Sequence, residues 1–237
     1  MSLTHWPRRV DALAQFKVRD VASPALDHAA RHHLFDVLRA TDGEEIVVTD
    51  GAGRWAFAGV NAGAILRSSD VGLDEPLADT VLYLAPLKGE RSEWAIAKIT
   101  ELGVARVVPL LSERLATRFK GETRDKILNR WRRVSDEAAA QSRRTYDLLI
   151  DAPVSVADVP VHVAVCDFDG DGDWSGVRAV AIGPEGGFAP GEWSDDRRRL
   201  GLGPSVLRGE TAAVVAGALL AFGTGKWGFS LRGAADE

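Results

Sequence analysis

Two glycine-rich stretches carry the residues of this sequence whose types and spacing favour ligand chemistry. The stretch "AIGPEGGFAPGEW" (181–193) runs from a short apolar segment into glycines, prolines and the carboxylate Glu185. The stretch "LGLGPSVLRGETAAVVAG" (200–217) repeats this composition and leads directly into an apolar run. Glycine has no side chain, so backbone N–H and C=O groups can approach a ligand closely there. One such stretch alone is read as a tight turn, but two with embedded acids favour a binding site.

Familiar metal and nucleotide motifs are incomplete. "DFDGDGDWSGVR" (167–178) begins like a calcium loop, but its twelfth position is Arg178 instead of glutamate, which favours a flexible acidic loop. Neither "GAGRWA" (51–56) nor "GLGPSV" (201–206) completes the dinucleotide pattern GxGxxG. The five histidines and the single cysteine show no ligand spacing, so we expect no bound metal.

Composition predicts a soluble globular protein. Of the 237 residues, 46% are hydrophobic and 27% are charged, which argues against a disordered chain. The longest apolar run, "TAAVVAGALLAFG" (211–223), is too short to cross a bilayer and is typical of a buried helix. With one cysteine and no signal-like N-terminus, we expect a reducing, cytoplasmic location and no membrane partner.

The charge is unevenly distributed along the chain. The net charge is −5, but residues 88–147 carry 14 basic and 9 acidic side chains, a local net of +5. A basic segment of this kind favours a polyanionic partner. A solvated helix face explains the charge about equally well.

The first third of the chain has the pattern of a small β domain with one helix. The segment 45–60 contains two β-rich runs joined by "DGAG", which predicts a hairpin. The segment 23–43 predicts a helix with Ser23 as N-cap, Pro24 at the first helical position and Gly43 at its end. We expect a small barrel over residues 1–72 and a linker at 68–79.

The remainder alternates between strands and helices. Continuous apolar strands that alternate with helices predict an α/β domain with a parallel sheet covered on both faces. In such sheets ligands bind beyond the carboxyl ends of the strands, where both glycine-rich stretches fall. The expected strands are 80–87, 105–111, 161–168 and 178–183, and the expected helices are 90–103, 126–144 and 211–222.

Five motifs in one order resemble a known family. They are "HHLFDVLRATDGEEIVVTDG", "PLKGERSEWAIAKITELGVARVVPLLSER", "RWRRVSDEAAAQSRR", "AIGPEGGFAPGEW" and "LGPSVLRGETA". Together they resemble the ribosomal RNA small-subunit methyltransferase E family of the SPOUT superfamily. Those enzymes methylate N3 of a uridine in 16S ribosomal RNA with S-adenosylmethionine. Two alternatives stay open: a non-catalytic RNA-binding protein of the same fold, and a SPOUT methyltransferase acting at another RNA position.

The resemblance implies a specific architecture. Residues 1–72 would form a PUA-like RNA-binding barrel, and residues 73–237 a SPOUT domain with a deep C-terminal trefoil knot. The protein would be a homodimer with the 211–222 helix near the interface. A monomer with that helix in its own core is the alternative. The partner would be 16S ribosomal RNA within a 30S particle.

The resemblance also implies that the two glycine-rich stretches bind the cofactor. Apolar residues would pack on the adenine ring, and backbone groups would bind adenine and ribose. The implied cofactor-binding residues are Ile182, Gly183, Pro184, Glu185, Gly186, Gly187, Leu202, Gly203, Val206, Leu207 and Arg208.

Methyl transfer to a neutral imide nitrogen requires positioning and removal of the N3 proton. We expect Arg208 to orient the base or stabilise developing charge on its oxygens, and Glu210 or Glu185 to act in acid–base chemistry. The alternatives are that Arg208 and Glu210 only pair with one another, and that Glu185 caps a helix start near Trp193.

RNA contacts are expected on both predicted domains, although solvation alone accounts for any single basic side chain. Glu137, Gln141 and Arg144 are predicted to share one helix face. Phosphate contacts position an RNA, so we expect the target base to be selected by unstacking and pocket fit. The expected RNA-binding residues are Arg31, His32, His33, Arg39, Lys88, Arg91, Arg130, Arg132, Arg133, Gln141, Arg143 and Arg144.

Overall fold

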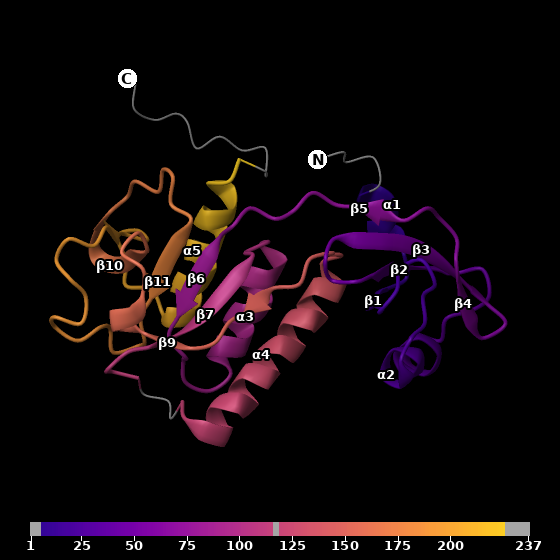
Figure 1. The fold of residues 1–237 in the computed structure, drawn as a ribbon, viewed down its shortest axis with the longest axis horizontal. Coiled ribbons are helices and arrows are strands. Elements are labelled where there is room, and N and C mark those ends of the chain that lie inside the picture. The colour runs from indigo at the N-terminus through magenta and orange to yellow at the C-terminus, as the bar shows by residue number, and fades with distance from the viewer. Residues whose placement is uncertain (1–5, 116–118, 226–237) are drawn as a thin grey trace. The chain divides into compact units, whose positions relative to one another are not determined.

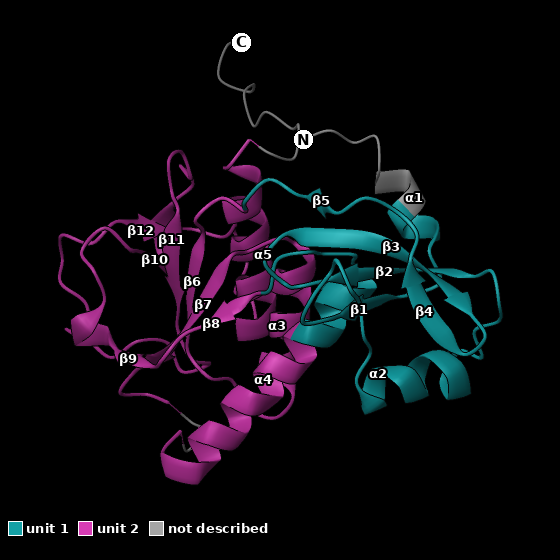
Figure 2. Ribbon diagram, turned by 45° about the vertical axis from the view of Figure 1, so that its right-hand side comes forward, with its two compact units in different colours: residues 1–76, 136–147 teal, residues 77–135, 148–237 magenta. Residues whose placement is uncertain are grey.

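The computed structural model describes residues 6–115 and 119–225, and the remaining residues of both predicted domains lie outside this description. The chain divides into two compact units (Figure 1). Unit 1 comprises residues 1–76 and 136–147, and unit 2 comprises residues 77–135 and 148–237. The division falls within the long helix α4 (Gly121–Gln141), whose last residues belong to unit 1 (Figure 2).

Unit 1 is built on a five-stranded sheet with the order β1-β2-β3-β4, in which β5 pairs with β3. The hairpin predicted at 45–60 is confirmed, because β2 and β3 pair antiparallel from Glu45↔Gly59 to Thr49↔Trp55. β5 lies within the segment expected to be a linker. The elements are α1 (Trp6–Asp11), β1 (Gln15–Lys17), β2 (Glu45–Thr49), β3 (Arg54–Asn61), β4 (Ala64–Arg67) and β5 (Gly72–Leu73).

The sheet of unit 1 is apolar on both faces. Successive side chains of a strand point to opposite faces, so neighbouring residues enter different clusters. Ile46 and Val48 pack in the larger cluster with Leu34, while Val47 packs with Trp55 on the other face. Because both faces of β2 are buried, its sequence is continuously apolar and does not alternate with polar residues.

The helix of unit 1 begins later than the sequence predicts. α2 (His28–His32) starts after Asp27, whose Oδ1 accepts a hydrogen bond from Ala30 N at 2.8 Å. The helical segment then continues as a π-helix, η2 (His33–Val37). The prediction of Ser23 as N-cap and of a helix to Gly43 was wrong. A carboxylate at Asp27 satisfies an unpaired N–H at the actual start, and Arg39, in the left-handed region at φ +56°, lies beyond the end.

Unit 2 contains a seven-stranded parallel sheet with the order β12-β10-β11-β6-β7-β8, in which β9 pairs with β7. The predicted strand–helix alternation is confirmed. The strands are β6 (Val81–Leu84), β7 (Arg106–Leu111), β8 (Leu149–Ile150), β9 (Val154–Ser155), β10 (Ala164–Asp171), β11 (Ala179–Ile182) and β12 (Arg199–Leu200). The helices are α3 (Arg91–Glu101), α4, the short η3 (Val156–Asp158) and α5 (Gly209–Phe222).

Both faces of this sheet are covered, as expected of parallel strands. Val180 and Ile182 of β11 pack in the cluster that holds residues of α3, α4 and α5. Ala179 and Ala181 point to the opposite face, where they pack with η3 and Trp193. Figure 1 shows α5 beside β6 and β11.

The acidic segment at 167–178 is partly a strand. The strand expected at 161–168 continues further, so the prediction of a loop was wrong for residues 169–171, where β10 runs to Asp171 and pairs with β12. Arg199 forms an ion pair with Asp167, and Arg198 Nη2 lies 3.2 Å from Asp173 Oδ2.

Within the described ranges, no helix has the length and apolar character needed to cross a membrane.

Candidate functional site

A cavity of about 660 Å³ opens in unit 2 beyond the carboxyl ends of neighbouring parallel strands. Its walls come from the middle of β10, the loop after β11, β12 with the loop that follows it, and the start of α5. This is the position at which open parallel sheets bind ligands, and the volume lies in the usual range for small-molecule sites.

The loop after β11 is folded onto a pair of aromatic rings. A Cβ on Gly183 would lie 3.0 Å from the ring of Phe188, so glycine allows this ring to pack against the backbone. Phe188 meets Trp193 edge to face at 5.2 Å between ring centroids. Gly187 has φ +67°, and its N–H donates to Pro184 O at 2.8 Å. The two glycines therefore serve close packing and a left-handed turn.

Glu192 holds the same loop against the segment after β7. Its Oε2 accepts hydrogen bonds from Ala189 N at 2.7 Å and Ser112 Oγ at 3.1 Å, and its Oε1 accepts one from Glu113 N at 2.8 Å. Arg114 Nη1 donates to Gly186 O at 3.2 Å. These contacts fix a wall of the cavity, and the sequence alone did not indicate them.

The loop after β12 forms the second wall. Gly203 has φ +118°, a conformation that favours glycine, and Val206 is 84% exposed at the cavity. Gly209, the first residue of α5, lies so close to Leu87 that a Cβ would be 2.7 Å from its Cδ2 atom. Glycine therefore lets the start of α5 approach the segment after β6.

Two carboxylates stand beside the cavity. Glu185 Oε1 accepts a hydrogen bond from Lys88 N at 2.8 Å and lies 3.5 Å from Arg91 Nη1. Glu210 Oε1 lies 3.8 Å from Arg91 Nε, while Glu210 Oε2 is buried without a hydrogen-bond partner among the described residues. The ion pair of Glu210 is with Arg91, whereas Arg208 exposes its side chain at the N-cap of α5. Glu185 bonds to the segment after β6, and no helix starts near Trp193 in the structure.

The cavity brings together both predicted glycine-rich stretches. Its lining includes every expected cofactor-binding residue except Arg208. Sequence reasoning missed further lining residues because they come from segments whose place beside β11 depends on strand order. These residues include Arg114, Cys166, Asp167, Phe168, Asp195 and Arg199.

Cys166 lies in this lining as an uncharged thiol. Burial, with a smaller contribution from the negative charge of Asp167, raises the pKa of the Cys166 thiol well above its usual range. The thiolate is therefore disfavoured at neutral pH. In the part of the chain that the structure describes, no group of three or more His, Cys, Asp and Glu side chains is arranged to hold a metal.

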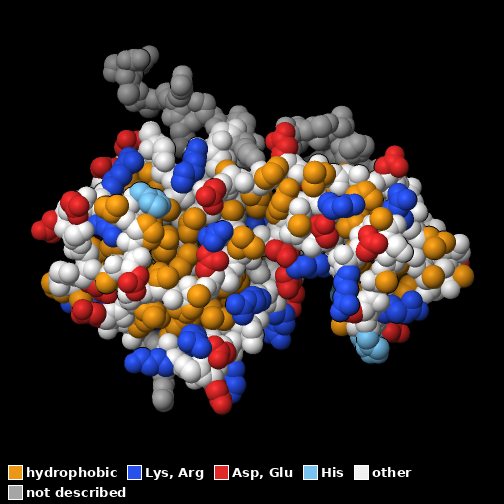
Figure 3. Space-filling model, viewed as in Figure 1, with side chains coloured by type: hydrophobic (Ala, Val, Ile, Leu, Met, Phe, Trp, Pro, Cys, Tyr) orange, Lys and Arg blue, Asp and Glu red, His pale blue; other side chains and the backbone are white. Residues whose placement is uncertain are grey.

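The basic residues expected to bind RNA have different surroundings. Arg31 Nη2 donates to Gly63 O at 2.9 Å and stacks over Phe35, and His32 Nδ1 lies 2.8 Å from Asp36 Oδ2. On α4, Arg130 contacts Glu90 and Glu93, whereas Arg132 and Arg133 are exposed. Figure 3 shows Lys and Arg side chains interspersed with Asp and Glu on the part of this face where α4 lies.

The side chains of Arg143 and Arg144 donate hydrogen bonds to backbone carbonyl groups. Arg143 takes φ +58° after the end of α4, so Arg144 does not continue the helix face of Glu137 and Gln141. The Arg143 guanidinium donates to Arg9 O at 3.1 Å and to Ala12 O at 2.7 Å. The prediction that Glu137, Gln141 and Arg144 share one helix face was therefore wrong, because the chain turns at Arg143.

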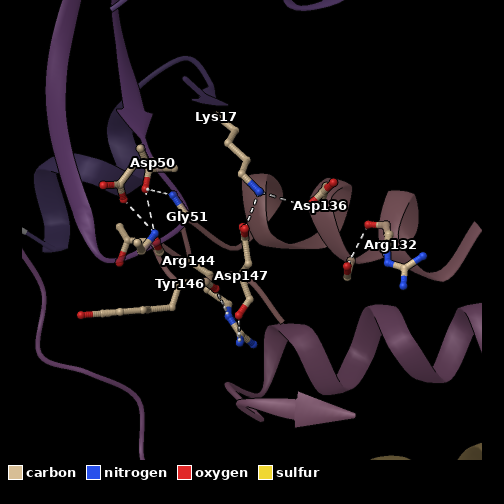
Figure 4. Close-up of polar contacts among 12 residues, drawn as sticks. Lys17, Asp50, Gly51, Arg132, Asp136, Arg144, Tyr146 and Asp147 are labelled. Atoms are coloured by element: carbon tan, nitrogen blue, oxygen red, sulfur yellow. Dashed lines mark hydrogen bonds and ion pairs between the residues drawn. The ribbon is translucent and has the colours of Figure 1, made fainter. Parts of the chain in front are cut away.

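Arg144 is held by backbone carbonyls next to the end of α4 (Figure 4). It donates to Tyr146 O and, at 3.1 Å, to Asp147 O. Burial lowers the pKa of Arg144 to about 10. Nearby, Lys17 pairs with Asp147 and lies 3.9 Å from Asp136. The contacts with Tyr146 O and Asp147 O hold the Arg144 guanidinium against the backbone of unit 1.

Comparison with solved structures supports the fold. A protein from Legionella pneumophila, solved in complex with the cofactor S-adenosylmethionine, aligns with a TM-score of 0.73 at 27% identity and covers 87% of this chain and 96% of its own. The ribosomal RNA small subunit methyltransferase E of Neisseria gonorrhoeae, bound to S-adenosylmethionine, aligns with a TM-score of 0.74 at 23% identity, over 88% of this chain and 97% of its own.

Sequence comparison gives the family. The RNA methyltransferase domain family matches residues 74–221, and the RNA methyltransferase PUA domain family matches residues 26–62. The ribosomal RNA small subunit methyltransferase E of Mycobacterium bovis is 33% identical over 224 residues, covering 82% of this chain and 84% of the relative. The enzyme of the same name from Bacillus subtilis is 26% identical, covering 81% of this chain and 87% of the relative. The chain belongs to the ribosomal RNA small subunit methyltransferase E family, with a PUA domain followed by an α/β methyltransferase domain of SPOUT type.

Proposed function

We propose that this protein transfers the methyl group of S-adenosylmethionine to N3 of one uridine in 16S ribosomal RNA. The observation that carries the proposal is the cavity that both glycine-rich loops line, with Glu185 and Glu210 at its edge. Family membership adds RNA methyl transfer as the reaction class. The uridine and its N3 as the site of methylation go beyond what family membership gives.

The residues of the cavity fit this cofactor. A volume of about 660 Å³ accommodates a nucleoside with an amino-acid tail. Ile182, Leu202 and Leu207 provide apolar walls for an adenine ring, and glycines leave backbone groups accessible. When bound, S-adenosylmethionine supplies an activated methyl group on its sulfonium, so the protein needs mainly to position the acceptor nitrogen.

Arg208 is our candidate for orienting the uracil. It is exposed immediately before α5, next to residues that line the cavity. A guanidinium there donates hydrogen bonds to the uracil oxygens and stabilises negative charge that develops on them.

Glu210 is our preferred acceptor for the N3 proton. Glu185 already accepts a backbone hydrogen bond from Lys88, whereas Glu210 Oε2 has no partner among the described residues. A carboxylate oxygen without a partner is available to accept a proton once substrate lies beside it. Glu185 then has mainly a loop-positioning role.

The PUA domain and the methyltransferase domain both contribute RNA contacts in this proposal. Exposed cationic and polar side chains bind phosphates and position the RNA without reading its sequence. The proposed set is Arg31, His32, His33, Arg39, Lys88, Arg130, Arg132, Arg133 and Gln141.

We also propose a homodimer, a C-terminal trefoil knot, a 30S particle as substrate and a cytoplasmic location. The apolar composition of α5 and the partial exposure of residues such as Val214, Val215 and Leu219 support a partner on this helix. Light scattering is expected to give twice the mass of one chain.

A methylation assay tests the function. Small-subunit particles that lack the modification are incubated with labelled S-adenosylmethionine, and the modified nucleotide is mapped. We expect label on N3 of one 16S uridine, none on fully modified particles, and loss of about 100-fold or more of the rate in Arg208→Ala. Cofactor binding without transfer to particles or naked RNA would leave a non-catalytic RNA-binding protein, and label at another position would leave a related methyltransferase.

A further inference from the structure

Arg91 stands between the two carboxylates of the candidate site. Its Nη1 is 3.5 Å from Glu185 Oε1, and its Nε is 3.8 Å from Glu210 Oε1. The side chains of Glu185 and Glu210 are only 22% and 15% exposed, and that of Arg91 is 42% exposed. One guanidinium therefore approaches two half-buried acids with different nitrogens.

The three residues come from three different strand ends. Arg91 begins α3 after the loop that follows β6, Glu185 follows β11, and Glu210 lies in the first turn of α5 after the loop that follows β12. The loop that contains Glu185 and the loop that precedes Glu210 form two walls of the cavity. Lys88 N adds a hydrogen bond from the β6 loop to Glu185. Arg91 thus links the segment after β6 to both walls.

Charge explains why an arginine suits this place. Two carboxylates of like charge at one end of a sheet repel one another, and a positive charge between them offsets that repulsion. Guanidinium presents several donors in a fixed planar fork, so one side chain serves two acceptors, whereas an ammonium acts as a single point charge.

We propose that Arg91 is a positioning residue for methyl transfer, which holds Glu185 and Glu210 in place, and that phosphate binding is not its main role. The inference rests on the proposed function and deepens it. Arg91 acts through the two carboxylates, which set the position of the cofactor-binding loops and of the proton acceptor. A displacement of about 1 Å at such groups lowers rates by about 100-fold.

Steady-state kinetics separate the two roles of Arg91. For Arg91→Ala we expect kcat to fall about 10–100-fold, with the KM for 30S particles within about twofold of the wild type. Arg132→Ala serves as the comparison, since this arginine is exposed on α4 and is proposed to bind phosphate. Its KM is expected to rise, and the slope of log affinity against log salt to fall by about one.

Two further variants keep the test independent of folding. Arg91→Lys keeps the charge and is expected to recover only part of kcat. Arg91→Ala combined with Glu210→Gln is expected to be slower than Glu210→Gln alone by clearly less than the factor that Arg91→Ala costs in the wild type, because residues in one network are not additive. Calorimetry with S-adenosylhomocysteine measures the affinity of the site without turnover, and Arg91→Ala is expected to weaken this binding several-fold because the two loops are less well held.

The outcomes are distinguishable. A raised KM for Arg91→Ala, with unchanged kcat, unchanged S-adenosylhomocysteine affinity and a salt slope lowered by about one, would overturn the proposal and make Arg91 a phosphate ligand. Full activity of both Arg91 variants would overturn it as well. If the wild type itself transfers no methyl group, the proposed function fails, while the calorimetric comparison still tests whether Arg91 positions the loops.

Discussion

Glu185 and Glu210 carry the same charge at the same end of the sheet, but their surroundings differ. Glu185 is fixed by Lys88 N at 2.8 Å, while Glu210 keeps one buried oxygen without a partner among the described residues. In the proposed reaction, this difference assigns loop positioning to Glu185 and proton transfer to Glu210.

The difference predicts unequal effects of two matched substitutions. Glu210→Gln is expected to lower kcat about 100-fold or more and to leave the affinity for S-adenosylhomocysteine nearly unchanged, because the amide cannot accept the N3 proton. Glu185→Gln is expected to weaken S-adenosylhomocysteine binding and to lower kcat less. Single-turnover kinetics measure the rate of methyl transfer in both variants, and calorimetry measures their affinity for S-adenosylhomocysteine. A larger loss of rate in Glu185→Gln than in Glu210→Gln would contradict the assignment of Glu210.

The environment of Cys166 predicts low thiol reactivity. Its pKa is raised by burial, so little thiolate forms at pH 8, and the thiol lines the cavity. Alkylation by iodoacetamide at pH 8 is expected to be at least about 100-fold slower in the folded protein than in urea. S-adenosylhomocysteine is expected to slow it further. Mass spectrometry of the chain's single cysteine reports both rates, and a fast reaction in the folded state would contradict the burial.

The strands β10 and β12 approach one another through glycines. A Cβ on Gly170 would lie 2.3 Å from the backbone carbon of Leu200, and one on Gly201 would lie 2.7 Å from Gly170 O. Backbone atoms cannot move aside as side chains do, so only glycine fits. This contact places the end of β10 beside the loop that carries Leu202.

A pair of alanine substitutions tests the contact. Gly170→Ala is expected to destabilise unit 2 by about 1–3 kcal/mol and to weaken S-adenosylhomocysteine binding, because the two strands must separate. Gly172→Ala is the matched control, since its Cβ would meet no atom within 4 Å, and it is expected to change stability by less than about 0.5 kcal/mol. Urea unfolding and calorimetry measure the two effects. Equal behaviour of the two variants would show that β10 and β12 tolerate a side chain there.

Helix α4 illustrates how one element serves two units. The sequence predicts it as one basic helix, but its last residues belong to unit 1. There Gln15 Nε2 donates to Ala139 O at 3.3 Å and to Arg144 O at 2.7 Å. A sequence pattern gives the periodicity of a helix and cannot give this long-range attachment.

We expect cofactor binding to slow hydrogen exchange in unit 2 and not in unit 1. Every described residue that lines the cavity belongs to unit 2. A ligand at 100 times its Kd stabilises the folded state by about 2.7 kcal/mol. With S-adenosylhomocysteine we expect slower hydrogen exchange in β10, β11 and the start of α5, and no change in β2 and β3. Protection confined to unit 1 would contradict a cofactor site in this cavity.

The sequence alone determined the order of the longer strands and helices of unit 2, the two glycine-rich loops and the family, but not the short strands β8, β9 and β12. Strand and helix periodicities, turn glycines and motif order are local properties, so β6, β7, β11, α3 and α5 were predictable. The start of α2 was mispredicted because Ser23 and Asp27 both have the chemistry of an N-cap, and only the folded chain selects Asp27.

The tertiary structure decided which residues meet. It placed β10 beside β11, which brought Cys166 and Phe168 to the cavity, and it turned Arg144 inward to backbone carbonyls. It also placed Arg91 between Glu185 and Glu210, about 95 and 120 residues away along the chain. Strand order and ion pairing depend on contacts between segments distant in sequence, and local propensities carry no information about those contacts.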